Sequence, residues 1–411
     1  MVSEASGHGN APVFGQQTRT LIGASLAHWV SHVHILTLPP LFPILKDQFD
    51  VTYVELGLAV TLFAIVSGLT QAPMGFAVDR FGARRILIAG LCLGGLSFML
   101  LGLSPTYANM LICALVSGLA NCVYHPADYA ILSSSIDERR IGRAFSVHTC
   151  CGMAGGAMAP AIGLGLALQF DISVALIVIG AFGPIAALAI ILLRVPESET
   201  ATDRAAKANG KPSQKVSVLT PAILALTVFF VLLSLSNGGV STFGIAALQG
   251  GYNFSLETAS LTLSIYLGAL SIGVLAGGVL ADKTRHHGYI AATCFAINAV
   301  IFAMIAAVPM EMMVTMSALV FAGFLSGLIS PSRDMLVRKA APPGAAGRAF
   351  GIVSTGFNIG GILGPMMFGY ILDQEIPRWL FGISAGFMVL TVMLAVWTEN
   401  WSPRKPDTAT T

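Results

Sequence analysis

The sequence predicts an all-helical integral membrane protein, with twelve spanning helices arranged as two pseudo-symmetric bundles of six. Three observations lead to this fold class. The 411-residue chain is 55% hydrophobic and only 10% charged, with a mean hydropathy of +0.78, which leaves too little polar surface for a water-soluble protein. Apolar runs of roughly 20 residues, enough to cross a bilayer, recur along the chain. The second half repeats motifs of the first.

The apolar runs set the bounds of the predicted spans. We expect helices, because a segment in hydrocarbon must satisfy its own backbone hydrogen bonds and the alternating pattern of a barrel strand is missing. Prolines and glycines inside the spans should allow bending and close approach rather than end the helices. The predicted spans are 20–45, 54–78, 84–104, 107–132, 143–168, 172–194, 220–248, 257–281, 288–308, 312–338, 348–372 and 378–398.

A repeat with a fixed offset, from position 126 to position 331, relates the two halves. It predicts an N-terminal six-helix bundle at 1–195, a polar cytoplasmic linker at 196–219 and a C-terminal bundle with a short tail at 220–411. The matches are Pro126 with Pro331, Gly142 to Phe145 with Gly347 to Phe350, Gly155 and Gly156 with Gly360 and Gly361, and Pro160 with Pro365.

The placement of positive charge predicts the orientation. Of the 22 lysines and arginines, all but Lys46, Arg378 and the intramembrane Arg333 fall on one face. Positive charge gathers on the cytoplasmic side, so both termini and the linker are predicted to be cytoplasmic. There is no basic stripe for nucleic acid. The N-terminal residues lack the features of a cleavable signal peptide, and the six cysteines lie inside apolar spans, where we expect small buried hydrophobes.

Ionisable side chains inside the spans are the sharpest functional signal, because each costs ~2.5–3.5 kcal/mol or more at the bilayer centre. His28 and His32 share one helix face, ~14 and ~20 Å deep when counted from the charged end of their span. His125 and Asp128 share a face at ~21 and ~17 Å. All four can therefore meet near the midplane, where membrane transporters bind substrate.

These groups suit the binding and release of a proton, since histidine titrates near neutral pH. His148 can extend the proton path toward the cytoplasm. Two alternatives stay open: the side chains only join helices by hydrogen bonds, or His28, His32, His125 and Asp128 bind a transition metal.

The second half lacks these groups: Ser330, Arg333 and Val353 replace His125, Asp128 and His148. Arg333 allows three interpretations: pairing with Asp334 or Asp128 in a cytoplasmic gate, countering an anionic substrate, or a solvated helix end. Polar residues in apolar spans of this half are predicted to line the cavity, with hydrogen bonds between helices as the alternative. They are Asn237, Tyr266, Asn298 and Asn358.

A loop motif points to a family. G-F-A-V-D-R-F-G-A-R-R runs from Gly75 to Arg85, and G-V-L-A-D-K-T-R echoes it from Gly278 to Arg285. With the twelve spans and the central linker, the motif resembles the major facilitator superfamily. The resemblance implies transport by alternating access and a gating role for the motif, against the alternative of a charge cluster that only sets topology. The implied gating residues are Gly75, Asp79, Arg80, Gly82 and Arg84, with Asp282 in the second copy, where Arg285 stands in the place of Gly82.

Four short runs look like the bacterial fosmidomycin-resistance-type efflux branch. They are Ser25 to His28, Leu41 to Pro43, Gln71 to Gly75, and Val123 to Pro126. Two departures from that branch stand out, since His32 occupies the place of an expected acid and the acid expected after His-Pro is displaced to Asp128. The run from Gly152 to Gly163 resembles the glycine-proline motif of drug/proton antiporters, with tight helix packing as the alternative.

The predicted function is therefore a proton-coupled secondary transporter, and neither an enzyme nor a sensor, since no nucleophile, oxyanion donor set or signalling domain is visible. We expect a monomer in the bacterial inner membrane that contacts lipid, protons and a small polar or anionic organic solute, with drug efflux as one option. The proton gradient is the expected energy source, without a cofactor. Transport of a transition metal or a metal chelate is the alternative.

Overall fold

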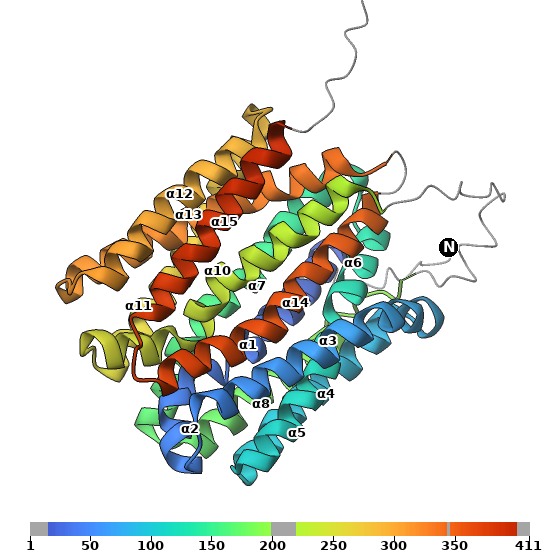
Figure 1. The fold of residues 1–411 in the computed structure, drawn as a ribbon. Coiled ribbons are helices and arrows are strands. Elements are labelled where there is room, and N and C mark those ends of the chain that lie inside the picture. Colours follow the sequence, from blue (N-terminus) through green and yellow to red (C-terminus); the bar gives the residue numbers. More distant parts are fainter. Residues whose placement is uncertain (1–14, 199–218, 343–345, 401–411) are drawn as a thin grey trace, which may run out of the picture.

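The computed structural model describes residues 15–198, 219–342 and 346–400, which form helices joined by short connections (Figure 1). Twelve helical segments in this part of the chain are long and apolar enough to cross a membrane, which confirms the predicted fold class. The helices are α1 (Gln16–Ile35), the 3-10 helix η1 (Pro39–Leu41), α2 (Phe42–Phe49), α3 (Tyr53–Phe81), α4 (Ala83–Leu103), α5 (Tyr107–Asn121), α6 (Tyr124–Ser135), α7 (Glu138–Gln169), α8 (Ile172–Leu192), α10 (Pro221–Tyr252), α11 (Leu256–Lys283), α12 (His287–Ala307), α13 (Met312–Ala340), α14 (Ala346–Asp373) and α15 (Trp379–Asn400).

The helix ends follow local capping chemistry. The hydroxyls of Thr52, Thr106 and Thr220 each accept a hydrogen bond from the backbone N–H three residues further on, at the starts of α3, α5 and α10. Such caps satisfy donors that have no partner inside the helix. The largest difference from the predicted spans is at α7, which begins at Glu138 rather than at residue 143. Its first turn is charged, so an apolar-run criterion misses it.

Two of the twelve spans are interrupted, where the sequence predicts continuous helices. The first span breaks between α1 and α2, where Pro39 opens η1 and Pro43 lies in the first turn of α2. The fourth span breaks at Cys122 and Val123. There the next helix carries Pro126, which has no N–H to donate and whose ring crowds the carbonyl four residues earlier. Its counterpart Pro331 lies inside the continuous helix α13.

The packing of the helices repeats between the halves. In the first half α1 packs on α7, α4 on α8, and α3 on α5. In the second half the equivalent pairs are α10 with α14, α12 with α15, and α11 with α13. Figure 1 places the blue-to-green helices of the first half beside the yellow-to-red helices of the second. Of the predicted linker, residues 196–198 and Leu219 are described, and 199–218 lie outside the described residues.

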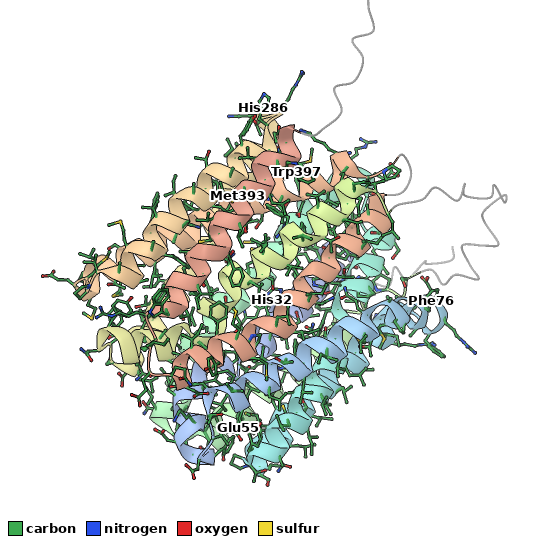
Figure 2. The ribbon with its side chains drawn as sticks, viewed as in Figure 1. His32, Glu55, Phe76, His286, Met393 and Trp397 are labelled. Carbon is green, nitrogen blue, oxygen red and sulfur yellow. The ribbon has the colours of Figure 1, made fainter. Side chains whose placement is uncertain are left out.

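The two halves meet along two helix pairs, α3 with α14 and α7 with α11. At the end of the molecule that carries Glu55 (Figure 2), the rings of Phe42 and Phe243 lie 5.5 Å apart across the halves, and Tyr53 is edge-on to Phe243 at 6.0 Å. Gly57 is tightly packed there, since an added Cβ would lie 2.7 Å from the carbonyl oxygen of Pro365. The halves are therefore closely packed at this end.

The other end, which carries the start of the linker and is called the linker end below, is less tightly joined along α3. In the second half of this helix, Leu69 is 73% and Phe76 79% exposed. Figure 2 shows Phe76 projecting outward from the bundle. The tight inter-half contacts of α3 therefore lie before Leu69.

Candidate functional site

Close packing of α1 on α7 brings the histidines of α1 against the fifth span. Gly155 makes this approach possible, because an added Cβ would clash with the carbonyl oxygen of Trp29. At Gly152 an added Cβ would lie 2.6 Å from two atoms of the His28 ring. The glycine-rich run of α7 therefore forms the surface on which His28 rests.

Four imidazole rings form a cluster around His28. Its ring stacks on that of His148, with centroids 4.1 Å apart and planes 12° from parallel. The rings of His32 and His125 are edge-on to it, at 4.7 and 5.5 Å. The Nδ1–H of His28 donates to the backbone carbonyl of His148 at 2.9 Å. Since a carbonyl only accepts, Nδ1 carries a proton and Nε2 is the free basic nitrogen.

Asp128 approaches this cluster from α6. Its Oδ2 lies 3.7 Å from Nε2 of His148, and both side chains are completely buried. Within the described residues, neither carboxylate oxygen and neither ring nitrogen of this pair has a hydrogen-bond partner. An ionised carboxylate in such a place is costly unless a positive charge or a proton compensates it. A proton on either member of the pair would supply this compensation.

The cluster is closed on one side and open on the other. Asp128 and His148 are fully buried, whereas His125 is exposed and Tyr129 keeps 44% of its surface. The rings of His125 and Tyr129 stack at 6.0 Å. Figure 2 shows His32 about midway between the two ends of the bundle. The buried pair thus has an exposed imidazole nearby.

The structure brings together five of the residues that the sequence marks as candidates. His28, His32, His125, Asp128 and His148 stand in one cluster. Their roles in transport stay predictions. His34 points away from the cluster: it lies against α8, and its Nε2–H donates to the carbonyl of Ile179 at 3.2 Å.

The described residues contain no group of three or more histidine, cysteine, aspartate or glutamate side chains that could hold a metal ion. In the cluster the rings of His28 and His148 stack, and those of His32 and His125 are edge-on to His28. Metal ligands instead direct their lone pairs at one point. The metal alternative therefore gains no support from this arrangement.

Arg333 is held in place rather than free in the space between the halves. Its Nε and Nη2 both donate to Oδ1 of Asp334 at 2.9 Å. Its guanidinium lies over the rings of Phe230 and Phe357, at 5.1 and 5.2 Å. Of the partners expected from the sequence, Asp334 is thus the one that Arg333 contacts. The Asp334 carboxylate and the two aromatic rings therefore compensate most of the positive charge of the guanidinium.

The predicted polar lining of the second half is mostly engaged in contacts between helices. Tyr266 is 1% exposed, and its hydroxyl donates to Oδ1 of Asn237 at 3.3 Å. Ser326 donates to the same oxygen at 3.2 Å and accepts from Asn298 at 3.0 Å. Tyr266 is therefore too buried to line a cavity. Asn358 packs against Gly68 of α3, where an added Cβ would lie 3.1 Å from its side chain.

The loop motif between α3 and α4 contains one glycine that the backbone requires. Gly82 has φ +93°, a conformation that other residues rarely adopt. Gly75 is different, because an added Cβ would meet nothing within 4 Å. Gly75 therefore makes no close helix contact in this conformation. Arg80 is exposed and lies over the ring of Phe81 at 5.3 Å, and Asp282 of the second copy is exposed.

Glu197, which the sequence did not suggest, occupies the N-terminus of α4. Its Oε1 accepts from the backbone N–H of Arg84 at 2.7 Å, and its Oε2 lies 4.0 Å from Nε of Arg85. In the second half Glu399 accepts from the N–H of Gly288 at 2.8 Å, at the start of α12. The sequence does carry a signal for these two contacts: in each half, an acidic residue follows the end of the last predicted span. Anions are favoured at helix N-termini.

The fold and the buried polar cluster define a class: multi-pass membrane transporters built from two related six-helix halves. The sequence agrees with the model of the Major Facilitator Superfamily over residues 24–346 and 314–410, and the chain belongs to this family. It is a transporter, not an enzyme. The predicted family is thereby confirmed.

Two relatives with similar sequences are named for resistance or efflux. The chain is 24% identical over 397 residues to the fosmidomycin resistance protein of Escherichia coli K12, covering 92% of this chain and 93% of that one. It is 24% identical over 388 residues to the multi-drug resistance efflux pump PmrA of Streptococcus pneumoniae, covering 90% and 92%.

Solved structures share the fold. A bacterial homologue of the human lysosomal transporter Spinster, in an inward-facing and unoccupied conformation, matches with a TM-score of 0.76 and 14% identity, over 96% of this chain and 100% of that one. The nucleoside transporter NupG matches with a TM-score of 0.74 and 16% identity, over 93% and 100%.

Proposed function

We propose that this chain is a proton-coupled secondary active transporter that moves a small polar organic solute across a bacterial inner membrane by alternating access. The observation that carries the proposal is the buried pair of Asp128 and His148, which stacks through His148 onto His28. An intramembrane carboxylate and imidazole without a structural partner are costly to keep and are typical of proton relays. Both termini are proposed to be cytoplasmic, from the placement of positive charge.

The proton would enter and leave through the exposed side of the cluster. His125 is exposed, and its ring lies 5.5 Å from that of His28, which stacks on His148. A proton on the inner pair neutralises the carboxylate or creates an imidazolium beside it, and either change alters the charge that a solute in the cavity meets. Binding of proton and solute would thus be coupled through the same few side chains.

Alternating access is supported by the way the halves meet. Contacts between α3 and α14 join the halves at the end that carries Glu55. Near the linker end, the exposed apolar turns of α3 are available for packing in another conformation. Such a pattern suits a conformation that is closed at one end.

The substrate class follows in part from Arg333. The sequence-based preference for an anion depends on this arginine, and Asp334 already compensates its charge. We therefore propose a polar organic solute without requiring an anion. Export by antiport is the proposed direction, in view of the resistance and efflux proteins among the relatives.

The test uses full-length protein in proteoliposomes with an imposed pH gradient, and fosmidomycin and ethidium as two probe solutes. Asp128→Asn should abolish gradient-driven flux, and His148→Ala should reduce it roughly 100-fold or more, the usual size of a lost proton-transfer group. Asp137→Asn, an exposed acid at the start of α7, is the charge-matched control. Gradient dependence that survives in both site variants would refute the assigned roles.

A second readout does not depend on knowing the substrate. A protonated buried carboxyl group has an infrared C=O band that an ionised carboxylate lacks. A pH titration of the wild-type protein should reveal a carboxyl band that Asp128→Asn removes and Asp137→Asn retains. A difference spectrum identical in the three proteins would contradict a proton on the pair.

A further inference from the structure

Two buried polar atoms border the same space beside Gly94 of α4. An added Cβ at this glycine would lie 3.7 Å from Oη of Tyr124 on α6 and 3.4 Å from Nδ1 of His34 on α1. The contact with Ala120, at 3.3 Å, is tight but not a clash, whereas a Cβ at the neighbouring Gly95 would clash with a backbone oxygen of α8. Gly94 therefore leaves room between two polar atoms rather than between two backbones.

The two atoms complement each other as hydrogen-bond donor and acceptor. The Nε2–H of His34 donates to the carbonyl of Ile179, so Nδ1 is the basic nitrogen of the neutral ring and has no partner within the described residues. The hydroxyl of Tyr124 is buried and also lacks a partner there. The two residues are only 6% and 3% exposed. Buried water commonly satisfies such groups when two or more of them are within reach.

Tyr124 connects this space to the candidate site. It lies one helical turn before Asp128 on α6, so the two side chains share a face, and the charge of Asp128 acts on the Tyr124 hydroxyl. Along α6, Tyr124 is about 6 Å further from the linker end than Asp128. Along α1, His34 is about 9 Å further from that end than His28. Both residues therefore lie on the side of the cluster that faces the closely packed end with Glu55.

We propose that a water molecule beside Gly94 joins Oη of Tyr124 to Nδ1 of His34, and that these groups form a second branch of the proton path. A proton that leaves the Asp128 carboxyl group binds the oxygen of Tyr124, while the hydroxyl proton passes to the water and a water proton passes to Nδ1. Tyrosine and water stay neutral, Asp128 becomes a carboxylate and His34 an imidazolium.

Such a branch deepens the proposed transport function and rests on it. A coupled transporter must exchange its proton with both compartments, and the exposed side of the cluster serves only one of them. The branch through Tyr124 leads toward the other. The water site itself can be tested without any transport measurement.

Hydroxyl-radical footprinting tests the water site in the wild-type protein. X-rays generate radicals from water bound inside a protein as well as from bulk water, and peptide mass spectrometry locates the oxidised side chains. Tyr124 should be oxidised several-fold faster than Tyr266, an equally buried tyrosine whose hydroxyl donates to Asn237. Gly94→Ala should lower the Tyr124 rate to that of Tyr266, and Gly165→Ala, whose methyl meets nothing within 4 Å, should not.

Equal oxidation of Tyr124 and Tyr266 in the wild-type protein would overturn the water site. So would a Tyr124 rate that Gly94→Ala leaves unchanged. The first comparison needs no variant, so it holds even where a substitution impairs folding.

Transport of the probe solutes in proteoliposomes tests the branch. Tyr124→Phe should lower gradient-driven flux roughly 100-fold or more, as for a lost proton-transfer group. Solute exchange without a gradient should persist, because it requires no change in protonation. His34→Gln, which keeps an N–H donor for Ile179 and removes the basic nitrogen, should behave likewise. Tyr266→Phe, the same change at a hydrogen-bonded tyrosine, should retain both activities. Gradient-driven flux that survives in Tyr124→Phe, or parallel loss of flux and exchange, would overturn the branch.

The two proposals can fail separately. Gradient-driven flux that survives in Asp128→Asn would refute the proposed function, whereas the footprinting result at Tyr124 does not depend on coupling through Asp128. Flux that is lost in Asp128→Asn but kept in Tyr124→Phe would overturn the branch alone.

Discussion

Asp373, at the end of α14, binds the backbone of Tyr53, at the start of α3, and so joins the two halves of the transporter. Its Oδ1 accepts from the N–H of Tyr53 at 2.8 Å, and its Oδ2 accepts from the N–H of Val54 at 2.9 Å. These donors belong to the first turn of α3, where a helix lacks internal partners. A residue of one half thus caps a helix of the other, at the end remote from the linker.

Asp373→Asn should weaken the closure of this end. The amide replaces one acceptor with a donor and removes the negative charge from the helix N-terminus, a loss of about 0.5–2 kcal/mol. The population open at this end should therefore rise roughly 2- to 30-fold. Distances between spin labels at Gln48 and Gln374 measure it. The control is Glu375→Gln, the same chemical change on a neighbouring exposed acid, and equal distance distributions in the two variants would contradict a capping role.

Much of the candidate site could be predicted because span bounds and the helical rise fix both depth and face. Residues four apart on α1 and three apart on α6 had to project in similar directions, and counting from the charged ends placed them at one height. The structure accordingly gathers His28, His32, His125 and Asp128. What counting cannot give is which rings touch, and the stacking of His28 on His148 depends on the tight approach of α1 to α7.

Other features depend on contacts that no local pattern encodes. Pro126 and Pro331 share one repeated motif, yet only the first lies next to a broken helix. Glu197 contacts a helix that begins more than a hundred residues earlier in the chain. Tyr266 is polar in an apolar span, as a cavity residue would be, but its hydroxyl faces Asn237. Tertiary packing decides each of these cases.

Gly152→Ala should displace the His28 ring from its position against α7. The added methyl would stand 2.6 Å from the ring, so the ring must move away from the His148 carbonyl, at a cost of about 1–3 kcal/mol for overpacking. Gradient-driven flux should fall, and its pH profile should shift. Gly165→Ala on the same helix is the control, because its methyl meets nothing within 4 Å. In a His28→Ala background the substitution should have little further effect, and an undiminished effect there would contradict the positioning role.

Tyr266→Phe separates a structural from a substrate-lining role for the polar residues of the second half. Loss of the hydrogen bond to Asn237 should lower the free energy of unfolding by ~0.6 kcal/mol, the average for such bonds in membranes. The KM for a transported probe should stay constant, because Tyr266 is 1% exposed. Thermal unfolding and flux at several probe concentrations give the two quantities. A raised KM with unchanged stability would favour the lining role instead.

Glu197→Gln should destabilise the junction of α4 with the beginning of the linker. The carboxylate accepts from the N–H of Arg84 at 2.7 Å, and a neutral amide there gives up the favourable charge at a helix N-terminus. The expected loss is about 0.3–1 kcal/mol, seen as a lower melting temperature. Asp47→Asn, an exposed acid on α2, is the control for net charge. Because Gly82 packs against the same carboxylate, with an added Cβ only 2.5 Å from it, Gly82→Ala should cost more than Glu197→Gln. A larger loss of stability in Glu197→Gln than in Gly82→Ala would mean that the contact of Glu197 does not hold the loop between α3 and α4.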